Sequence, residues 1–135
     1  MPVQTFRIDS QEEIRDAFRQ MEAQRPDALL AFLSPRLNSL RGEVIRHAAN
    51  MRLPSIAHQE GFAQDGGLMS YGPSFDEAWR RVAYFVDRIL KGAKPSELPI
   101  EQPTKFALLV NAKTAQALGV VLPPLILLRA EQVIE

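Results

Sequence analysis

The chain has 135 residues, of which 46% are hydrophobic and 24% are charged, the composition of one ordinary globular domain. Its sixteen basic and sixteen acidic residues balance, so the charge predicts neither nucleic-acid binding nor attraction to an anionic membrane. There is no cysteine, which excludes disulfides, thiol catalysis and cysteine-based metal sites.

The first third of the chain alternates strand-like and helix-like patterns. Residues 3–8 are predicted to form a strand. Ser10 and Glu13 have the spacing of a helix-capping box, and the apolar residues after them, at intervals of three and four, predict a helix that ends at Pro26. The continuous apolar run over residues 28–33 is typical of a strand that is buried on both faces of a parallel sheet.

The middle of the chain continues this alternation. Apolar spacing predicts a helix over residues 39–51, in which His47 is expected at the surface, and a strand follows at 54–57. Residues 58–65 are expected to form a polar loop. The run 68–71 is bracketed by glycines and predicts another strand.

A long amphipathic helix is predicted after this strand. Ser74 and Glu77 again have capping-box spacing, and Gly92 is expected to end the helix. Its apolar residues form one broad face, on which Trp79 is expected to pack into the core. The face consists of Phe75, Ala78, Trp79, Val82, Ala83, Val86, Ile89 and Leu90.

The last third is predicted to return to the sheet. Residues 93–104 lack periodicity and are expected to be a surface connection. A strand is expected at 106–110, followed by a short helix that begins at the cap Asn111 and ends at Gly119. Pro124 is expected to begin a last helical turn through Arg129, and residues 131–135 to form a tail or a short strand.

This alternation predicts an α/β fold, a mostly parallel sheet with flanking helices. Ligands of such sheets bind beyond the carboxyl ends of the strands. There, the ring of Tyr71 can stack on a ligand, with Phe62 as a weaker candidate, and Ser34, Gln59 and Ser70 can form hydrogen bonds to it. The predicted ligand-binding residues are Ser34, His58, Gln59, Ser70 and Tyr71.

Nothing in the sequence marks an enzyme. His58 and Glu60 are close enough in sequence to suggest a general base with a carboxylate partner, but a solvated loop is the favoured interpretation. No phosphate-binding glycine motif is present, and two histidines without cysteine do not predict a zinc site. We therefore expect no catalytic residue, no metal and no cofactor.

Several stretches together resemble the closing half of the solute-binding proteins of bacterial ABC transporters, the group that includes the tryptophan/tyrosine-type binding proteins. The resemblance extends over essentially the whole chain and rests on the order and spacing of its stretches. These are residues 52–56, 66–73, 86–95, 98–106 and 111–119.

The resemblance implies a partial type I periplasmic-binding-protein fold, which is Rossmann-like. Such proteins have two α/β lobes that clamp a ligand between them. Residues 1–65 and 105–135 would then belong to the second lobe, 66–92 to a segment that completes the first lobe, and 93–104 to a linker. The implied partners are a small polar or amino-acid-like ligand and an ABC permease.

The first half of the family pattern is absent from the sequence. A truncated reading frame, an expressed fragment and a short descendant with a changed role are all compatible with this. The alternative function is a stand-alone intracellular ligand-sensing or protein-interaction module.

The expected location depends on the same question. The resemblance implies the periplasm, whereas residues 1–5 do not begin a secretory signal, so the chain as written would be cytoplasmic. The longest apolar run, residues 120–128, is too short to cross a bilayer, and we expect no direct membrane insertion.

The apolar face of the long helix also predicts an assembly. In the two-lobed parent, this helix would lie against sheet that the present sequence lacks. It can fold back onto its own sheet, or two chains can exchange it. We expect a homodimer with residues 68–91 at or near the interface.

Overall fold

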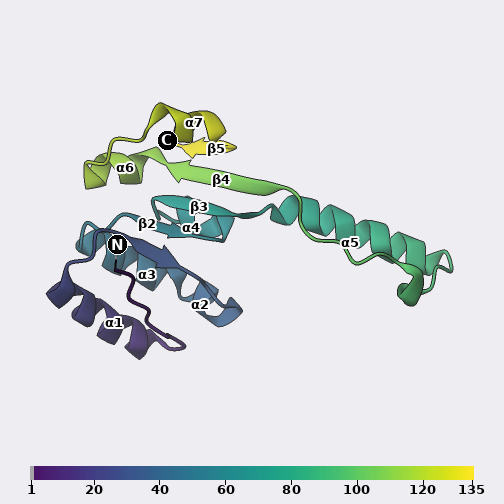
Figure 1. Cartoon of the computed structure of the whole chain (residues 1–135), viewed down its shortest axis with the longest axis horizontal. Helices are drawn as coiled ribbons and strands as arrows, with labels where there is room; N and C mark the ends of the chain where they lie inside the picture. The colour runs from purple at the N-terminus through teal and green to yellow at the C-terminus, as the bar shows by residue number, and fades with distance from the viewer. Residues whose placement is uncertain (1) are drawn as a thin grey trace.

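Five strands form one central sheet, in the order β1-β2-β3-β4-β5, in a computed structural model that describes residues 2–135 (Figure 1). The first three strands run parallel to one another, β4 runs antiparallel to β3, and β5 runs parallel to β4. This confirms the predicted α/β class and mostly parallel sheet. The strands are β1 (Leu29–Ala31), β2 (Ser55–Ala57), β3 (Met69–Pro73), β4 (Phe106–Asn111) and β5 (Gln132–Ile134).

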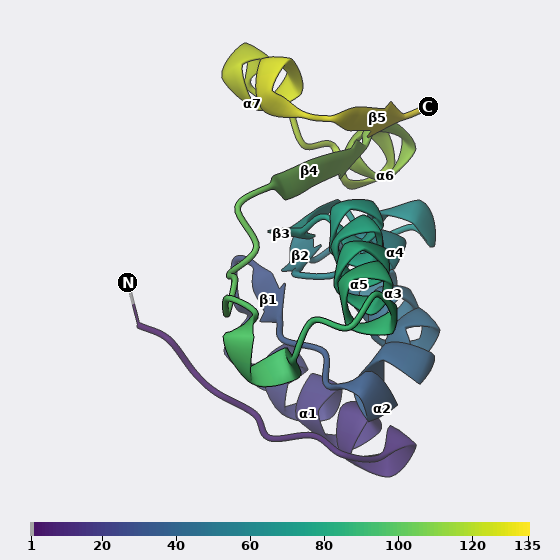
Figure 2. The same ribbon diagram turned by 90° about the vertical axis from the view of Figure 1, so that its right-hand side faces the viewer.

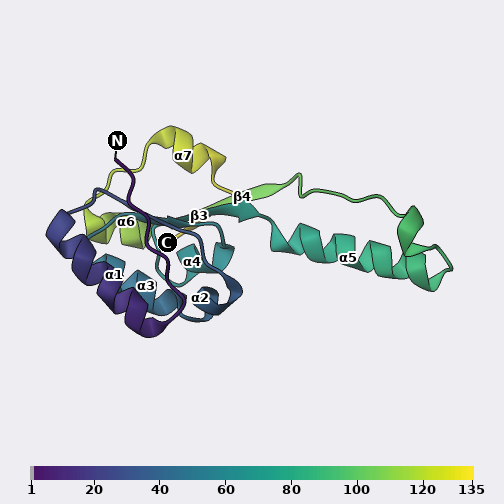
Figure 3. The same cartoon turned by 60° about the horizontal axis from the view of Figure 1, so that its bottom comes forward.

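More helices lie on one face of the sheet than on the other. Helices α3, α4 and α6 cover one face, whereas α7 lies towards the other (Figures 2 and 3). No helix within residues 2–135 combines the length and the apolar character that crossing a membrane requires. The helices are α1 (Gln11–Gln24), α2 (Pro35–Ser39), α3 (Arg41–Asn50), α4 (Glu60–Gln64), α5 (Phe75–Leu90), the 3₁₀ turn η1 (Pro95–Glu97), α6 (Ala112–Leu118) and α7 (Pro124–Arg129).

Side-chain caps explain where two of the helices begin. The Ser10 hydroxyl accepts a hydrogen bond from the backbone N–H of Glu13 at 3.2 Å, as the capping-box spacing predicted. The Asn111 side chain accepts one from the N–H of Thr114 at 2.9 Å, which confirms the predicted cap of α6. Ser74 makes no such bond at the start of α5, so the second predicted capping box is wrong.

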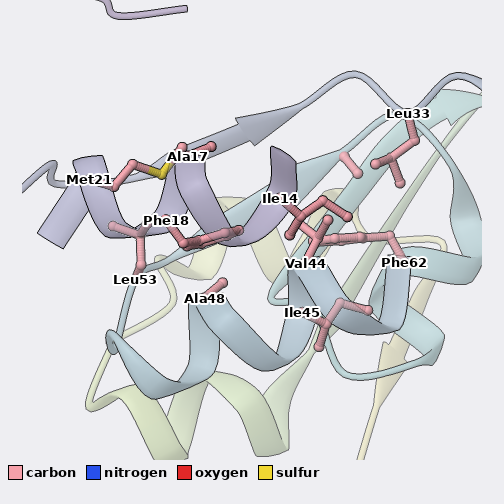
Figure 4. Close-up of a cluster of buried hydrophobic side chains, with 11 residues drawn as sticks. Ile14, Ala17, Phe18, Met21, Leu33, Val44, Ile45, Ala48, Leu53 and Phe62 are labelled. Atoms are coloured by element: carbon pink, nitrogen blue, oxygen red, sulfur yellow. The ribbon is translucent and has the colours of Figure 1, made fainter. Parts of the chain in front are cut away.

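The main core lies between α1, α3 and the sheet (Figure 4). Ile14 and Phe18 of α1 pack with Val44 of α3 and with Phe62 of α4, and all four are buried. Phe62 is fully buried, so it is a core residue and not a ring that stacks on a ligand. A Cβ added at Gly67 would lie 2.2 Å from the Phe62 ring, so any other residue at this position would clash with that ring.

Three sequence-based expectations about the elements are wrong. Residues 3–8 form no strand, because Phe6 and Ile8 satisfy their apolar pattern by packing on the main core without backbone pairing. The expected loop 58–65 contains α4, which is stabilised by the burial of Phe62 and Ala63. The run 28–33 is buried on one face only.

Two further expectations need correction in detail. The predicted helix 39–51 is divided at Leu40, where α2 has ended and α3 begins. His47 is not a surface residue, because its ring stacks on Phe18 with a centroid distance of 5.0 Å. Its side chain is 23% exposed, and its Nε2 atom is buried without a hydrogen-bond partner.

Asn111 links three elements and provides a test of the fold. Its side-chain amide donates to the backbone oxygen of Ala63 at 2.9 Å, besides capping α6. We expect Asn111→Ala to lower the free energy of unfolding by about 1–3 kcal/mol, because a buried carbonyl loses its partner. Urea denaturation measures this. The matched control is Asn50→Ala at an exposed site, expected within about 0.5 kcal/mol of the unchanged chain; equal losses would contradict the assigned role.

Candidate ligand-binding edge

The carboxyl ends of β1, β2 and β3 lie at one edge of the sheet because these strands run parallel. The register pairs Ala31 with Ala57, and Ala57 with Ser70. The next residue of each strand points to the opposite face, since side chains alternate along a strand. Those residues are Phe32, His58 and Tyr71.

The three rings form an aromatic row on the outer face of the sheet, with Phe106 of β4 at its end. The Phe32 and His58 rings stack at a centroid distance of 6.2 Å, and those of Tyr71 and Phe106 at 5.7 Å. Phe32 is 75% exposed and Tyr71 54% exposed. The aromatic row (Phe32, His58, Tyr71, Phe106) is therefore open to a ligand.

Phe32 and Phe106 were not predicted as site residues. Both lie in apolar runs that predict strands, and the run with Phe32 was expected to be buried on both faces. Their place in the row follows only from the register of the strands, which the sequence does not state.

Ser34 and Gln59 lie beside this row, and each side chain makes one hydrogen bond to the backbone. The Ser34 hydroxyl accepts a hydrogen bond from the backbone N–H of Leu37 at 3.2 Å and so caps α2. The Gln59 amide donates to the backbone oxygen of Leu33 at 3.4 Å. The Ser34 hydroxyl proton and the Gln59 side-chain oxygen can still contact a ligand.

Ser70 is separated from the other predicted site residues. It lies on the helix-covered face, is 1% exposed, and donates its hydroxyl to the backbone oxygen of Glu60 at 3.4 Å. Its contact holds α4 against β3. The structure thus brings Ser34, His58, Gln59 and Tyr71 to one edge, whereas Ser70 is buried on the opposite face of the sheet.

The suggested catalytic pair is not assembled. Glu60 begins α4, and no ion pair joins it to His58 within the described chain. The His58 Nδ1 atom is buried without a hydrogen-bond partner, so no carboxylate orients this ring. Nor does any group of three histidine or acidic residues in the described chain have the geometry of a metal site.

Close backbone contact fixes the position of His58. A Cβ added at Gly72 would lie 1.8 Å from the backbone oxygen of His58. Glycine at this position lets β3 pass directly beside the end of β2, which brings Tyr71 next to His58.

Two hollows lie at the opposite edge of the sheet, beyond the amino ends of the strands. One, of about 480 Å³, is lined by residues that include Arg25, Asn50 and Leu53. The other, of about 330 Å³, is lined by residues that include Arg52 and Lys113. Neither hollow includes a residue of the aromatic row, so these hollows are not part of the carboxyl edge.

Helix α5 projects away from the body, together with the segment that returns to β4 (Figures 1 and 3). None of its residues is buried, and Trp79 is 68% exposed, so the expectation that Trp79 packs in the core is wrong. Arg81 forms an ion pair with Glu101 of the returning segment and holds the pKa of that carboxyl below its usual value. This ion pair thus joins α5 to the returning segment within the arm, residues 74–105.

Comparison with known proteins agrees with this architecture. Residues 1–134 match the family model described as ABC transporter substrate binding protein. The search of curated proteins finds no match.

Solved structures provide three similar folds. The ABC domain in complex with L-Trp from Streptococcus pneumoniae has a TM-score of 0.86 at 26% identity, over 97% of this chain and 44% of that one. A conserved domain protein from Vibrio cholerae has a TM-score of 0.80 at 22% identity, over 90% of this chain and 41% of that one. A ligand-free, open substrate-binding protein with adhesive properties from Clostridium difficile has a TM-score of 0.67 at 20% identity, over 94% and 42%.

The chain therefore spans less than half the length of each of these proteins. The two at 22% and 20% identity show the fold alone. The resemblance found in the sequence is confirmed by the family match, which covers nearly the whole chain. The chain belongs to the ABC transporter substrate-binding protein family.

Proposed function

We propose that the chain supplies one side of a solute-binding site, at the carboxyl edge of β1, β2 and β3, for an amino-acid-like ligand. The observation that carries the proposal is the exposed aromatic row, which lies where ligands of open α/β sheets bind. Substrate binding is the function of the family, and binding without catalysis is the role we propose here.

The chemistry of the edge favours a ligand that has both a ring and polar ends. Tyr71 offers a flat, exposed ring face, and an aromatic pair contributes about 0.5–1.5 kcal/mol beyond the area it buries. Ser34 and Gln59 have free hydrogen-bonding capacity for a carboxylate and an ammonium group. The L-Trp bound to the Streptococcus pneumoniae protein supports an aromatic amino acid as the first ligand to test.

The site is one-sided in this chain. Ligand pockets bury about 70–90% of a bound molecule, whereas the aromatic row is an open surface. We therefore expect weak binding by this chain alone, with a Kd of about 1 mM, which corresponds to about 4 kcal/mol.

The proposed transport role includes an ABC permease as the partner that receives the solute and the periplasm as the place of action. The assignment of residues 1–65 and 105–135 to one lobe, of 66–92 to a crossing segment and of 93–104 to a linker stays a prediction. The homodimer, with residues 68–91 at or near its interface, also stays a prediction. A stand-alone interaction module is the second candidate function, and the exposed apolar face of α5 favours it.

Binding of L-tryptophan can be followed by amide chemical shifts in the ¹⁵N-labelled chain. We expect the largest shifts at residues 32–34, 58–60 and 71–73. Tyr71→Ala should weaken binding several-fold, by about 1 kcal/mol, because the stacking ring is lost, and Tyr71→Phe should retain it. L-alanine, which has no ring, should bind more weakly than L-tryptophan.

Tyr84→Ala is the matched control. Tyr84 is also an exposed tyrosine, but it lies on α5, away from the carboxyl edge. It should leave the Kd unchanged. The proposal is wrong if no amide at the edge shifts at high millimolar ligand, or if both tyrosine variants change binding equally.

A further inference from the structure

One of the two hollows at the amino edge of the sheet is lined by two cationic side chains from distant parts of the chain. Arg52 follows the end of α3, and Lys113 lies in α6, just beyond the end of β4. Both line the hollow of about 330 Å³ between α3 and α6, and both are exposed. The fold thus brings two positive charges to one concave surface.

The hollow between α3 and α6 lies on the side of the body away from the arm. Its lining residues are near the amino ends of β2 and β3 and the carboxyl end of β4, which runs antiparallel to β3. Helix α5 leaves the body at the other end of β3 (Figure 1). In the two-lobed arrangement that the resemblance implies, α5 belongs to the first lobe. A lobe built around α5 therefore leaves this hollow open.

Hydrogen bonds hold the α6 side of the hollow in place. The Thr114 hydroxyl donates to the backbone oxygen of Gly66 at 2.9 Å, which ties α6 to the turn before β3. The Asn111 amide donates to the backbone oxygen of Ala63, which ties the start of α6 to α4. These bonds are internal to the fold, so the hollow is pre-formed, as most small-molecule sites are.

No carboxylate of the fold neutralises the two cations. Neither Arg52 nor Lys113 forms an ion pair within residues 2–135. Asp65 is the acidic residue closest in sequence to the lining, since it precedes Gly66, but its carboxylate pairs with Arg41 at 2.6 Å. Two cations beside one hollow, without a counter-charge, attract an anion.

The backbone of Arg52 is an independent reason to assign a role to its side chain. Its φ is 52°, in the left-handed region that glycine adopts at lower cost, and glycine is the usual residue after a helix end. A residue that keeps an unfavourable backbone conformation points to a function for its side chain. Arg25 also has a positive φ, but it lines the other hollow together with the acidic Glu22. Only the hollow between α3 and α6 has two cations and no acidic residue among its described lining.

We propose that the hollow between α3 and α6 binds a small organic anion, a carboxylate with a short aliphatic chain. Arg52 and Lys113 pair with the carboxylate, and the chain contacts the apolar part of the lining, Ala49, Ala117 and Leu118. The volume of about 330 Å³ is near the lower end of the range for small-molecule sites. Both cations repel an ammonium group, so this ligand differs from the amino-acid-like solute proposed for the carboxyl edge.

Titration of the ¹⁵N-labelled 135-residue chain with sodium hexanoate tests the site. We expect amide shifts at residues 49–53, 65–67 and 112–118 that saturate in the millimolar range. Hexanamide, which has the same chain without the charge, should bind about fivefold or more weakly, because both ion pairs are lost. Acetate, which has the charge without the chain, should also bind more weakly. Added sodium chloride should weaken hexanoate binding by screening.

Two variants test the cations, and a third is the matched control. Arg52→Gly and Lys113→Gln should each weaken hexanoate binding about fivefold. Arg52→Gly also relieves the left-handed backbone, so the thermal midpoint should not fall although binding does; a purely structural arginine would lower the midpoint. Arg129→Gln removes another exposed arginine, on α7, that forms no ion pair within residues 2–135, and it should leave the Kd unchanged.

The outcomes decide this proposal separately from solute binding, because the hollow and the aromatic row share no residue. Absence of shifts around the hollow at high millimolar hexanoate would overturn it, as would shifts confined to the aromatic row or to α5. Equal binding of hexanoate and hexanamide would overturn the role of the charges. Equal weakening by Arg129→Gln and by the two hollow variants would show a general effect of net charge and would also overturn the site.

Discussion

The antiparallel pairing of β3 with β4 is the interaction on which the rest of the molecule depends. It joins five residue pairs, from Met69 with Val110 to Pro73 with Phe106, and connects the parallel group β1–β3 to the parallel pair β4–β5. Both strands continue directly into the arm, so this ladder also sets the direction in which α5 leaves the body (Figure 1).

The same ladder separates the candidate binding edge from the exposed apolar face of α5. At the carboxyl edge it places Tyr71 beside Phe106, next to the row that begins with Phe32 and His58. Beyond the edge it carries α5 away from the body, with its apolar side in water. One surface has the chemistry for a small ligand, and the other is an exposed apolar helix face.

Local patterns were sufficient to predict most of the elements. The spacing of Ser10 and Glu13 located the start of α1, and Asn111 with Gly119 located both ends of α6, because these signals act over a few residues. The strand at residues 3–8 was not confirmed, since an alternating pattern shows which side chains are buried but not whether the backbone has a partner. Apolar periodicity also could not show that the apolar face of α5, with Trp79, is exposed, because burial depends on which element packs against that face.

The candidate site was predictable only in part, and for a related reason. Parallel strands bring their carboxyl ends together, so His58 and Tyr71 could be placed at one edge from the sequence. Which face each side chain takes depends on strand phase and register, and this separates buried Ser70 from exposed Tyr71 although they are neighbours in sequence. The same phase brings Phe32 into the row, which an apolar run alone could not reveal.

Amide hydrogen exchange at two protein concentrations tests most directly whether the predicted homodimer covers α5. The amides of β3 and β4 lie within one chain, so their protection should not change with concentration. The amides of α5 should be protected in a concentrated sample and should exchange faster after dilution below the Kd of the dimer, because a helix without a buried side is marginal in water. Protection of α5 that stays the same at both concentrations would contradict this account.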